Sequence, residues 1–343
     1  MKRLTIFLLT ASMALSSQAC KKKKQASKQP AGHQSARPRS AVSRVSGPRQ
    51  ATGQPTTRPW AIPVSSLPLD SDALAYVSLT KLKKTPQWGL ISGFVASLDL
   101  YKHINKLCGL SLADAPETLA AATAYHRRDS TIILSGPNFP ADKIFSCLPK
   151  LAQEKSITWK PEGKNAGTLT IASMPCCRDL RIVQTGPRSI TLTMGEAAKA
   201  LAAGTKRARL GKNAKIFGLV DRVGGTDLWL LSLGLPPMLQ SKLPSANAVS
   251  QMRALALGVN LSAQGLALKL VVDMRAKKAA ADLAAVLNRY LPGLDRYSAN
   301  LAQLKPIFSK LHVGTDANYL TLSISLTWTD LGKLQALKAS MAR

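Results

Sequence analysis

The composition of this chain changes sharply at Trp60, and only the part after that residue has the composition of a folded protein. Residues 21–59 contain ten Lys or Arg residues, no Asp or Glu and almost no apolar side chains. Such a segment buries too little apolar surface to offset the entropy lost on folding, and like charges and prolines keep it extended. The sequence therefore predicts a disordered tether over residues 20–59 and a folded body over residues 60–343.

The first 20 residues have the organisation of an export signal. Lys2 and Arg3 precede the apolar stretch 4–15, which is shorter than the ~20 residues that a transmembrane helix needs. The segment then ends in Ser17-Gln18-Ala19-Cys20, a variant of the lipoprotein cleavage motif. We expect residues 1–19 to be a lipoprotein signal peptide and Cys20 to carry palmitate-type acyl chains. Plain secretion with a free Cys20 thiol is the alternative, since Ser17 and Gln18 are not the usual residues of that motif.

Acyl chains on Cys20 would hold the protein on the bacterial cell envelope, because every buried methylene adds ~0.8 kcal/mol to membrane binding. We expect an exported protein and favour the outer membrane over the inner membrane. The lysines that follow the lipid would lie close to anionic headgroups, which attract such clusters. We therefore expect polyanion binding at Lys21, Lys22, Lys23 and Lys24.

The folded body is basic in its own right. Residues 60–343 contain 35 basic and 18 acidic residues, a net charge of +17. A basic surface attracts polyanions through its summed potential. The candidate residues in the densest cluster are Lys206, Arg207, Arg209, Lys212 and Lys215, and two smaller clusters lie at 126–128 and at 275–278.

The expected partners are the membrane, reached through the N-terminal lipid, and an anionic envelope component or envelope protein. Lipopolysaccharide and a cell-wall polymer are the candidates for that component. Nucleic acid is disfavoured, because only 5% of the residues are aromatic and stacking platforms for single strands need aromatic side chains. A host whose exported proteins are generally basic would also explain the charge.

Apolar periodicity predicts a mixture of strands and helices in the body. The predicted strands are 73–79, 118–125, 131–134, 167–171, 189–193, 226–232, 255–261, 266–273 and 320–326. The predicted helices are 81–98, 139–151, 195–203, 276–290, 295–311 and 330–341. Residues 262–265 are predicted to join two of these strands as a hairpin.

The order of these elements is similar in the two parts of the body. The segment 72–79 resembles 227–233, the strand pair and helix at 118–151 match 253–290, and 189–203 matches 318–340. We interpret the body as a duplicated unit, with a first α+β unit over 60–205 and a second over 206–343. The predicted fold class is α+β, with antiparallel sheets and helices packed on one side.

The chain also resembles a group of functionally uncharacterised envelope lipoproteins from myxobacteria and related delta-proteobacteria. The resemblance rests on the segment 17–20 with its Lys-rich continuation, on 72–82, on 107–110 and on Cys147, and it covers most of residues 70–200. It implies a cell-envelope lipoprotein and no particular activity.

Four cysteines remain after Cys20, and an even number in an exported chain favours disulfides. We favour Cys108–Cys147, because both residues fall in helical segments separated by one strand pair. A bond between the adjacent Cys176 and Cys177 would be strained, and pairing of either with Cys108 or Cys147 is the competing arrangement. Zinc is disfavoured, because the sequence has no paired cysteine knuckles.

The sequence favours a non-enzymatic role, and no cofactor or metal is expected. No recognised catalytic motif occurs apart from Ser78-Leu79-Thr80-Lys81, which matches the S-x-x-K of penicillin-binding proteins. Because Ser78 ends a predicted strand, Lys81 need not lie over it. The leading hypothesis is a lipid-anchored envelope protein that binds an anionic component or a protein partner. The alternative is a hydrolase or transferase of the cell wall with an unrecognised site.

Overall fold

The computed structural model describes most of the chain from Trp60 onward. The described residues are 60–97, 99–124, 129–153, 157–171, 179–195, 197–198, 209–210, 214–224, 227–234, 250–291 and 305–341. The predicted signal peptide, Cys20 and the tether lie outside them.

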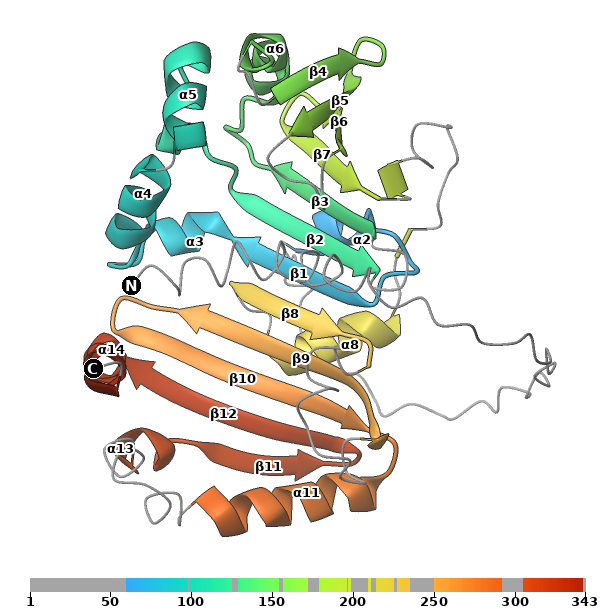
Figure 1. Cartoon of the computed structure of the whole chain (residues 1–343). Helices are drawn as coiled ribbons and strands as arrows, with labels where there is room; N and C mark the ends of the chain where they lie inside the picture. The colour runs from blue at the N-terminus through green and yellow to red at the C-terminus, as the bar shows by residue number, and fades with distance from the viewer. Residues whose placement is uncertain are drawn as a thin grey trace, which may run out of the picture.

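A single antiparallel sheet of twelve strands dominates the described part of the body (Figure 1). Its order is β11-β12-β10-β9-β8-β1-β2-β3-β7-β6-β5-β4. The strands of the first half are β1 (Ala73–Ser78), β2 (Thr118–Ala124), β3 (Asp129–Ser135), β4 (Ile157–Pro161), β5 (Ala166–Ile171), β6 (Asp179–Gly186) and β7 (Ser189–Met194). Those of the second half are β8 (Leu228–Ser232), β9 (Met252–Leu261), β10 (Gly265–Met274), β11 (His312–Asp316) and β12 (Tyr319–Thr327).

Helices accompany this sheet, so the fold is α+β with a strong β component. They are α2 (Ala61–Ser65), α3 (Leu79–Lys83), α4 (Trp88–Ser97), α5 (Asp99–Cys108), α6 (Ala141–Leu151), α8 (Ala214–Arg222), α11 (Lys277–Tyr290), α13 (Lys305–Phe308) and α14 (Trp328–Met341), with the short 3-10 helix η2 (Leu112–Asp114).

The two halves of the chain meet at the centre of the sheet, where β1 pairs with β8. Outward from that pair, the first half runs β1-β2-β3-β7-β6 and the second half runs β8-β9-β10-β12-β11. A helix follows the third strand in each half, α6 after β3 and α11 after β10. The strand order and the helix after the third strand are therefore shared by the two halves as described, whereas β4 and β5 and the helices α3, α4 and α5 belong to the first half.

Helices pack on both faces of the sheet, so the prediction of helices on one side is wrong. Successive side chains of a strand point to opposite faces. On β10, Val271 belongs to a cluster with residues of α2 and α8, whereas Val272 packs with Ala280 of α11. On β3, Ile133 joins the α2 and α8 side, and Leu134 packs with α5 and α6.

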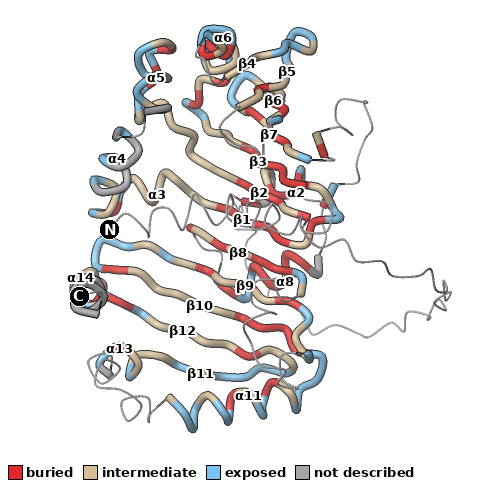
Figure 2. The backbone as a smooth tube through the Cα atoms, viewed as in Figure 1, coloured by how far each residue is buried: buried red, intermediate tan, exposed pale blue. Residues whose placement is uncertain are grey.

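The largest buried cluster lies on the α2 and α8 face and draws residues from both halves (Figure 2). Trp60 lies 1% exposed between Phe217 of α8 and Trp229 of β8, with ring centroids 5.3 and 5.8 Å away. Tyr76 of β1 stacks on Trp229 from the other side, at 6.1 Å. The two sequence units thus share one core on this face.

Several elements differ from the sequence-based expectation. The helix predicted over 81–98 is divided into α3 and α4, because Pro86 lies in the turn between them and lacks the amide hydrogen that a continuous helix needs. The ranges predicted for strands and helices did not include β4, β6, β11, α2, α5 and α8. The predicted helices 195–203 and 295–311 lie largely outside the described residues, apart from 197–198 and α13.

Candidate functional site

The basic cluster predicted at 206–215 is described only at Arg209, which is exposed. Arg209 forms an isolated β-bridge with Pro68, and the amide of Leu210 donates to the carbonyl of Leu67 at 2.9 Å. Leu210 is 4% exposed in the central core, so this segment is fixed beside α2. The remaining candidates fall outside the described residues or side chains: Lys206, Arg207, Lys212, Lys215 and Lys21–Lys24.

The basic cluster at 275–278 is described in full, and it surrounds the N-terminus of α11. Arg275, Lys277 and Lys278 are all exposed. The N-cap residue is Ala276, which has no side chain to accept a hydrogen bond from the first turn, and that turn contains no acidic residue. The unpaired amide groups and the three cations therefore combine into one positive region.

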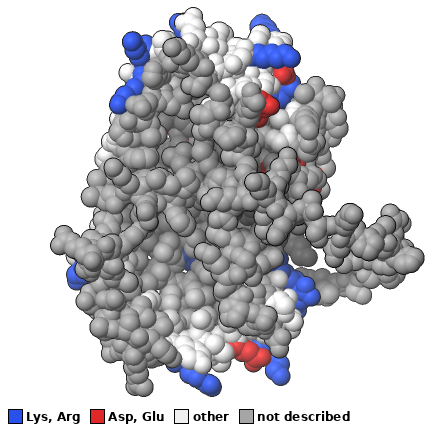
Figure 3. Space-filling view, viewed as in Figure 1, with Lys and Arg blue, Asp and Glu red and all other residues white. Residues whose placement is uncertain are grey.

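The corresponding helix of the first half has the ordinary arrangement of charge. Asp142 lies in the first turn of α6 and Lys150 in its last turn, as the helix dipole favours. Figure 3 shows Lys and Arg side chains at both ends of the molecule in this view, near α5 and α6 and near α11. The first turn of α6 also contains Lys143, but beside Asp142, whereas the start of α11 has cations and no acidic residue.

A small pocket lies between the end of α2 and the strands β2 and β3. Its polar lining comes from Asp70, Ser71, Asp129, Ser130 and Thr131. One carboxylate oxygen of Asp129 accepts a hydrogen bond from the Ala197 amide at 3.0 Å, which fixes the start of the segment after β7. This contact gives Asp129 a structural role.

The lysine of the S-x-x-K segment, Lys81, forms an ion pair with Asp227. Ser78 is the last residue of β1, and the ammonium of Lys81 lies 2.6 Å from a carboxylate oxygen of Asp227. The other carboxylate oxygen accepts a hydrogen bond from the Leu261 amide at 3.0 Å. Burial raises the pKa of the Tyr76 phenol, the charge of Asp227 raises it further, and the Ser78 hydroxyl opposes both. Because its ammonium is held by Asp227, Lys81 is not positioned as a base for Ser78.

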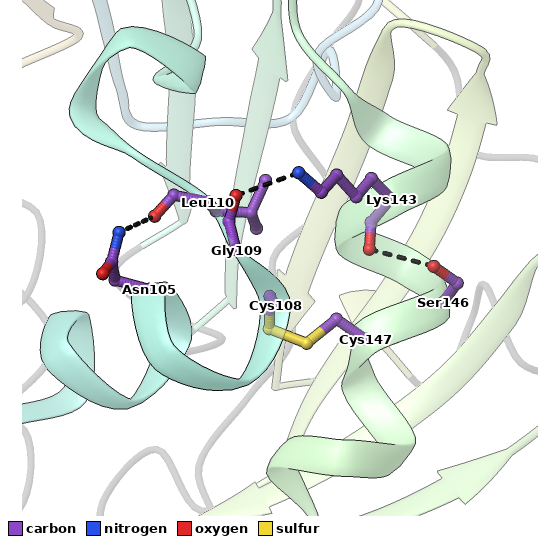
Figure 4. The surroundings of a disulfide bond; sticks show 7 residues. All are labelled: Asn105, Cys108, Gly109, Leu110, Lys143, Ser146 and Cys147. Atoms are coloured by element: carbon purple, nitrogen blue, oxygen red, sulfur yellow. Dashed lines mark hydrogen bonds between the residues drawn. A yellow bond between two sulfur atoms is a disulfide. The ribbon is translucent and has the colours of Figure 1, made fainter.

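Cys108 and Cys147 form a disulfide that joins the end of α5 to α6, with their Cα atoms 5.5 Å apart (Figure 4). Lys143 of α6 donates to the carbonyl of Gly109 at 2.9 Å, so the same two segments are also hydrogen bonded. Gly109 has φ of 58°, which a glycine adopts without strain after a helix. The predicted residues Cys176 and Cys177 lie outside the described part of the chain.

Among the described residues, no group of three or more His, Cys, Asp or Glu side chains is placed to hold a metal ion. His312 lies exposed on the edge strand β11 and belongs to no such group in the described ranges. Within the same ranges, no helix has the length and apolar character to cross a membrane.

Neither a protein-family model nor a curated protein matches this chain. Among solved structures, TP0453 in crystal form III is similar over 81% of this chain and 97% of that one, with a TM-score of 0.46 and 11% sequence identity. TP0453 in crystal form I gives a TM-score of 0.42 with 13% identity over 80% of this chain and 97% of that one.

Proposed function

We propose that this protein is an exported lipoprotein, anchored to the cell envelope through Cys20, whose basic body binds an anionic envelope component. The observation that carries the proposal is the positive N-terminus of α11. A cation at that end of a helix disfavours folding by about 0.3–1 kcal/mol, because it opposes the helix dipole. Arg275, Lys277 and Lys278 are therefore explained better by an anionic ligand than by stability.

The net charge of the body supports the same proposal. Several acidic side chains of the described residues are held in ion pairs with basic ones, among them Asp227 with Lys81 and Asp330 with Lys310. The body nevertheless has 17 more basic than acidic residues. A phosphate-bearing or carboxylate-bearing polymer or lipid of the envelope would complement that charge.

The shared strand order supports a further part of the proposal, which concerns the origin of the fold. We propose that the halves are copies of one duplicated unit, with β1 corresponding to β8 and α6 to α11. The second copy then acquired the positive helix N-terminus, while the first copy acquired the disulfide between α5 and α6.

Retention of the full chain on immobilised lipopolysaccharide tests the binding proposal. We expect retention at low salt and release as salt rises, because ion contacts are screened. The double variant Lys277→Glu with Lys278→Glu should elute at clearly lower salt. The matched control is Lys160→Glu with Lys164→Glu, which makes the same change of charge on exposed residues of the β4–β5 hairpin. Absence of retention at low salt, or an equal shift in both variants, would contradict the proposal.

A further inference from the structure

The two edge strands of the sheet, β4 and β11, differ in how they are protected. A free strand edge presents unpaired backbone groups that can pair with another chain, and proteins often protect such edges with lysine or proline. The strand β4 has both, because Lys160 and Pro161 are exposed at its end. The strand β11 has the sequence His-Val-Gly-Thr-Asp over 312–316, with no lysine, arginine or proline. This edge therefore lacks the protection that β4 has.

The outer side of β11, which faces away from β12, is accessible. Among the described residues, no strand or isolated bridge pairs with it (Figure 1). Gly314 at the centre of β11 is exposed, and because glycine has no side chain, the exposed surface is that of the backbone. Val313 packs in the cluster that contains Ala280 and Ala284 of α11. The helix thus covers one face of β11 and leaves the backbone edge exposed at Gly314.

The hairpin of β11 and β12 identifies which backbone groups lie on the outer side. Asp316 pairs with Tyr319 across a turn of two residues. Such a turn closes on a hydrogen-bonded pair, and hydrogen-bonded pairs alternate with other pairs along an antiparallel ladder. The residues of β11 that bond to β12 are therefore 312, 314 and 316. It follows that the amide and carbonyl groups of Val313 and Thr315 point outward.

These outward groups are arranged symmetrically on either side of Gly314. A second copy of β11, running antiparallel, can therefore pair with the first around a two-fold axis beside Gly314. Val313 of each copy then lies opposite Thr315 of the other, and the two pairs form four backbone hydrogen bonds across the edge. The edge is thus complementary to itself in a single register.

The same register pairs side chains of complementary charge. His312 of each copy lies opposite Asp316 of the other, at a position without backbone hydrogen bonds, where opposed side chains come closest. The Asp316 side chain is 71% exposed, and one of its oxygens lies 2.6 Å from the guanidinium of Arg222. The second carboxylate oxygen can accept a hydrogen bond from the imidazole of His312. Both ends of the paired strands would therefore carry a favourable contact.

The elements around β11 are compatible with this pairing. The two-fold axis is perpendicular to the sheet, so each face of the sheet points the same way in both copies. Because α11 contacts both β11 and β12, the two α11 helices would lie on the order of 10 Å apart, a usual distance for packed helices. Ala281 and Ala285 are exposed one turn apart on α11, and small side chains permit such an approach. Trp60 lies on the opposite face in both copies, so both chains enter from the same side.

We infer that β11 is an interface between two copies of this chain, which joins their sheets edge to edge. A second copy supplies the outward groups of Val313 and Thr315 and the pairing of His312 with Asp316 in one register, whereas an unrelated strand would have to match both by coincidence. The interface uses none of the cations at the N-terminus of α11. It therefore forms whether or not that cluster binds a polyanion.

Disulfide trapping tests the interface in the full chain with Cys20→Ser, which carries no lipid. In the inferred register, the two Gly314 Cα atoms lie about 4.5 Å apart, within the range that a disulfide spans. A Cβ atom added at Gly314 meets no described residue within 4 Å other than its chain neighbours, so Gly314→Cys fits the fold. We expect Gly314→Cys to form a covalent dimer under mild oxidation, with a bond between the two introduced cysteines in peptide mass spectra.

The matched control is Thr315→Cys, which is also exposed and lies one residue further along β11. Since Thr315 lies opposite Val313, the Cα atoms of the two introduced cysteines would be about 9 Å apart, too far for a disulfide. We expect little covalent dimer from this variant. Equal crosslinking of the two variants would overturn the inference, as would a disulfide from Gly314→Cys to another protein or to another part of the second copy.

Sedimentation tests the same interface without an introduced cysteine. We expect the parent chain with Cys20→Ser to show a concentration-dependent dimer at or below about 0.1 mM. Thr315→Pro removes an outward amide and keeps the hydrogen bonds between β11 and β12, so the dissociation constant should rise at least about tenfold. The control Thr315→Val keeps that amide and should dimerise as the parent does. A parent that stays monomeric, or a Thr315→Pro dimer as tight as that of the parent, would overturn the inference.

Discussion

Ala75 and Leu230 face each other at the centre of the junction between β1 and β8, and the other pairs of that junction are arranged evenly on either side. The junction is closed in the same way at both ends. The Ser78 amide donates to the Asp227 carbonyl at 2.6 Å, and the Leu233 amide donates to the Asp72 carbonyl at 2.7 Å. Backbone pairing therefore connects the two halves directly.

Loss of a core side chain beside this junction should destabilise both halves together. We expect Trp229→Ala to lower the free energy of unfolding by about 3–5 kcal/mol, because Trp229 packs against Trp60 and Tyr76 in the shared core. Hydrogen exchange measured by mass spectrometry should show weaker protection in β2 and β9 alike. The control is Phe145→Ala, which removes the contact with Trp159 in the first half only. Protection lost in one half by Trp229→Ala would contradict a shared core.

Removal of the disulfide should act mainly on the first half. The double variant Cys108→Ala with Cys147→Ala releases a loop with a sequence separation of 39 residues. In the chain-entropy model, closure of such a loop contributes roughly 3–4 kcal/mol. Thermal unfolding should shift to lower temperature, and hydrogen exchange should rise in α5 and α6 before β10 and β12. Reductant should reproduce the shift in the parent and leave the variant unchanged.

Asp330 should show the clearest pH dependence among the carboxylates of the second half. The hydrogen bond from Lys310 and those from the amide and hydroxyl of Thr327 lower its pKa to about 2. A carboxylate with a depressed pKa stabilises the fold above its unfolded pKa of ~3.9, and that contribution disappears as the pH falls toward 2. Carbon NMR titration should find the low pKa of Asp330 and a higher one in Lys310→Met. An equal pKa in both proteins would exclude Lys310 as the main cause.

Asp227 should matter more to stability than Lys81, although the two form an ion pair. The Lys81 side chain is 61% exposed and that of Asp227 is 4% exposed. Asp227→Ala leaves the partly buried Leu261 amide without its acceptor, so we expect a loss of about 1–3 kcal/mol in denaturant unfolding. Lys81→Met should cost less than about 1 kcal/mol, because exposed ion pairs are weak. A larger effect of Lys81→Met would overturn this assignment of roles, as would covalent labelling of Ser78 by a fluorescent penicillin.

The strongest predictions from sequence were those with a clear period. The hairpin of β9 and β10 and the helix α11 were predicted within a few residues, because alternation and helical spacing extend over ten or more residues in each. The same patterns underlie the correspondence of the two halves, which stays a prediction. Short elements have too few residues to show a periodic apolar pattern. The helix α2 has five residues, and β11 is a five-residue edge strand in which only Val313 packs inward.

The second face of the sheet was missed for a different reason. Residues 254–259 are apolar without interruption, a pattern typical of a strand covered on both faces, which the prediction of helices on one side did not take into account. The helix α8 was not predicted from the sequence. Its apolar spacing at Ile216, Leu219, Val220 and Val223 is visible in the sequence. The order of strands across the sheet depends on contacts far apart in the chain, which no local pattern specifies.

Trp60 determines how the body would respond to a pull from its N-terminal side. The described part of the chain begins there, and Trp60 packs against Phe217 and Trp229 at the middle of the sheet, far from the edge strands β4 and β11. A force transmitted along the preceding residues would reach the core at its midpoint and load both halves together. Backbone hydrogen bonds between several strands would then carry the force at the same time, and the two halves would resist unfolding as one mechanical unit.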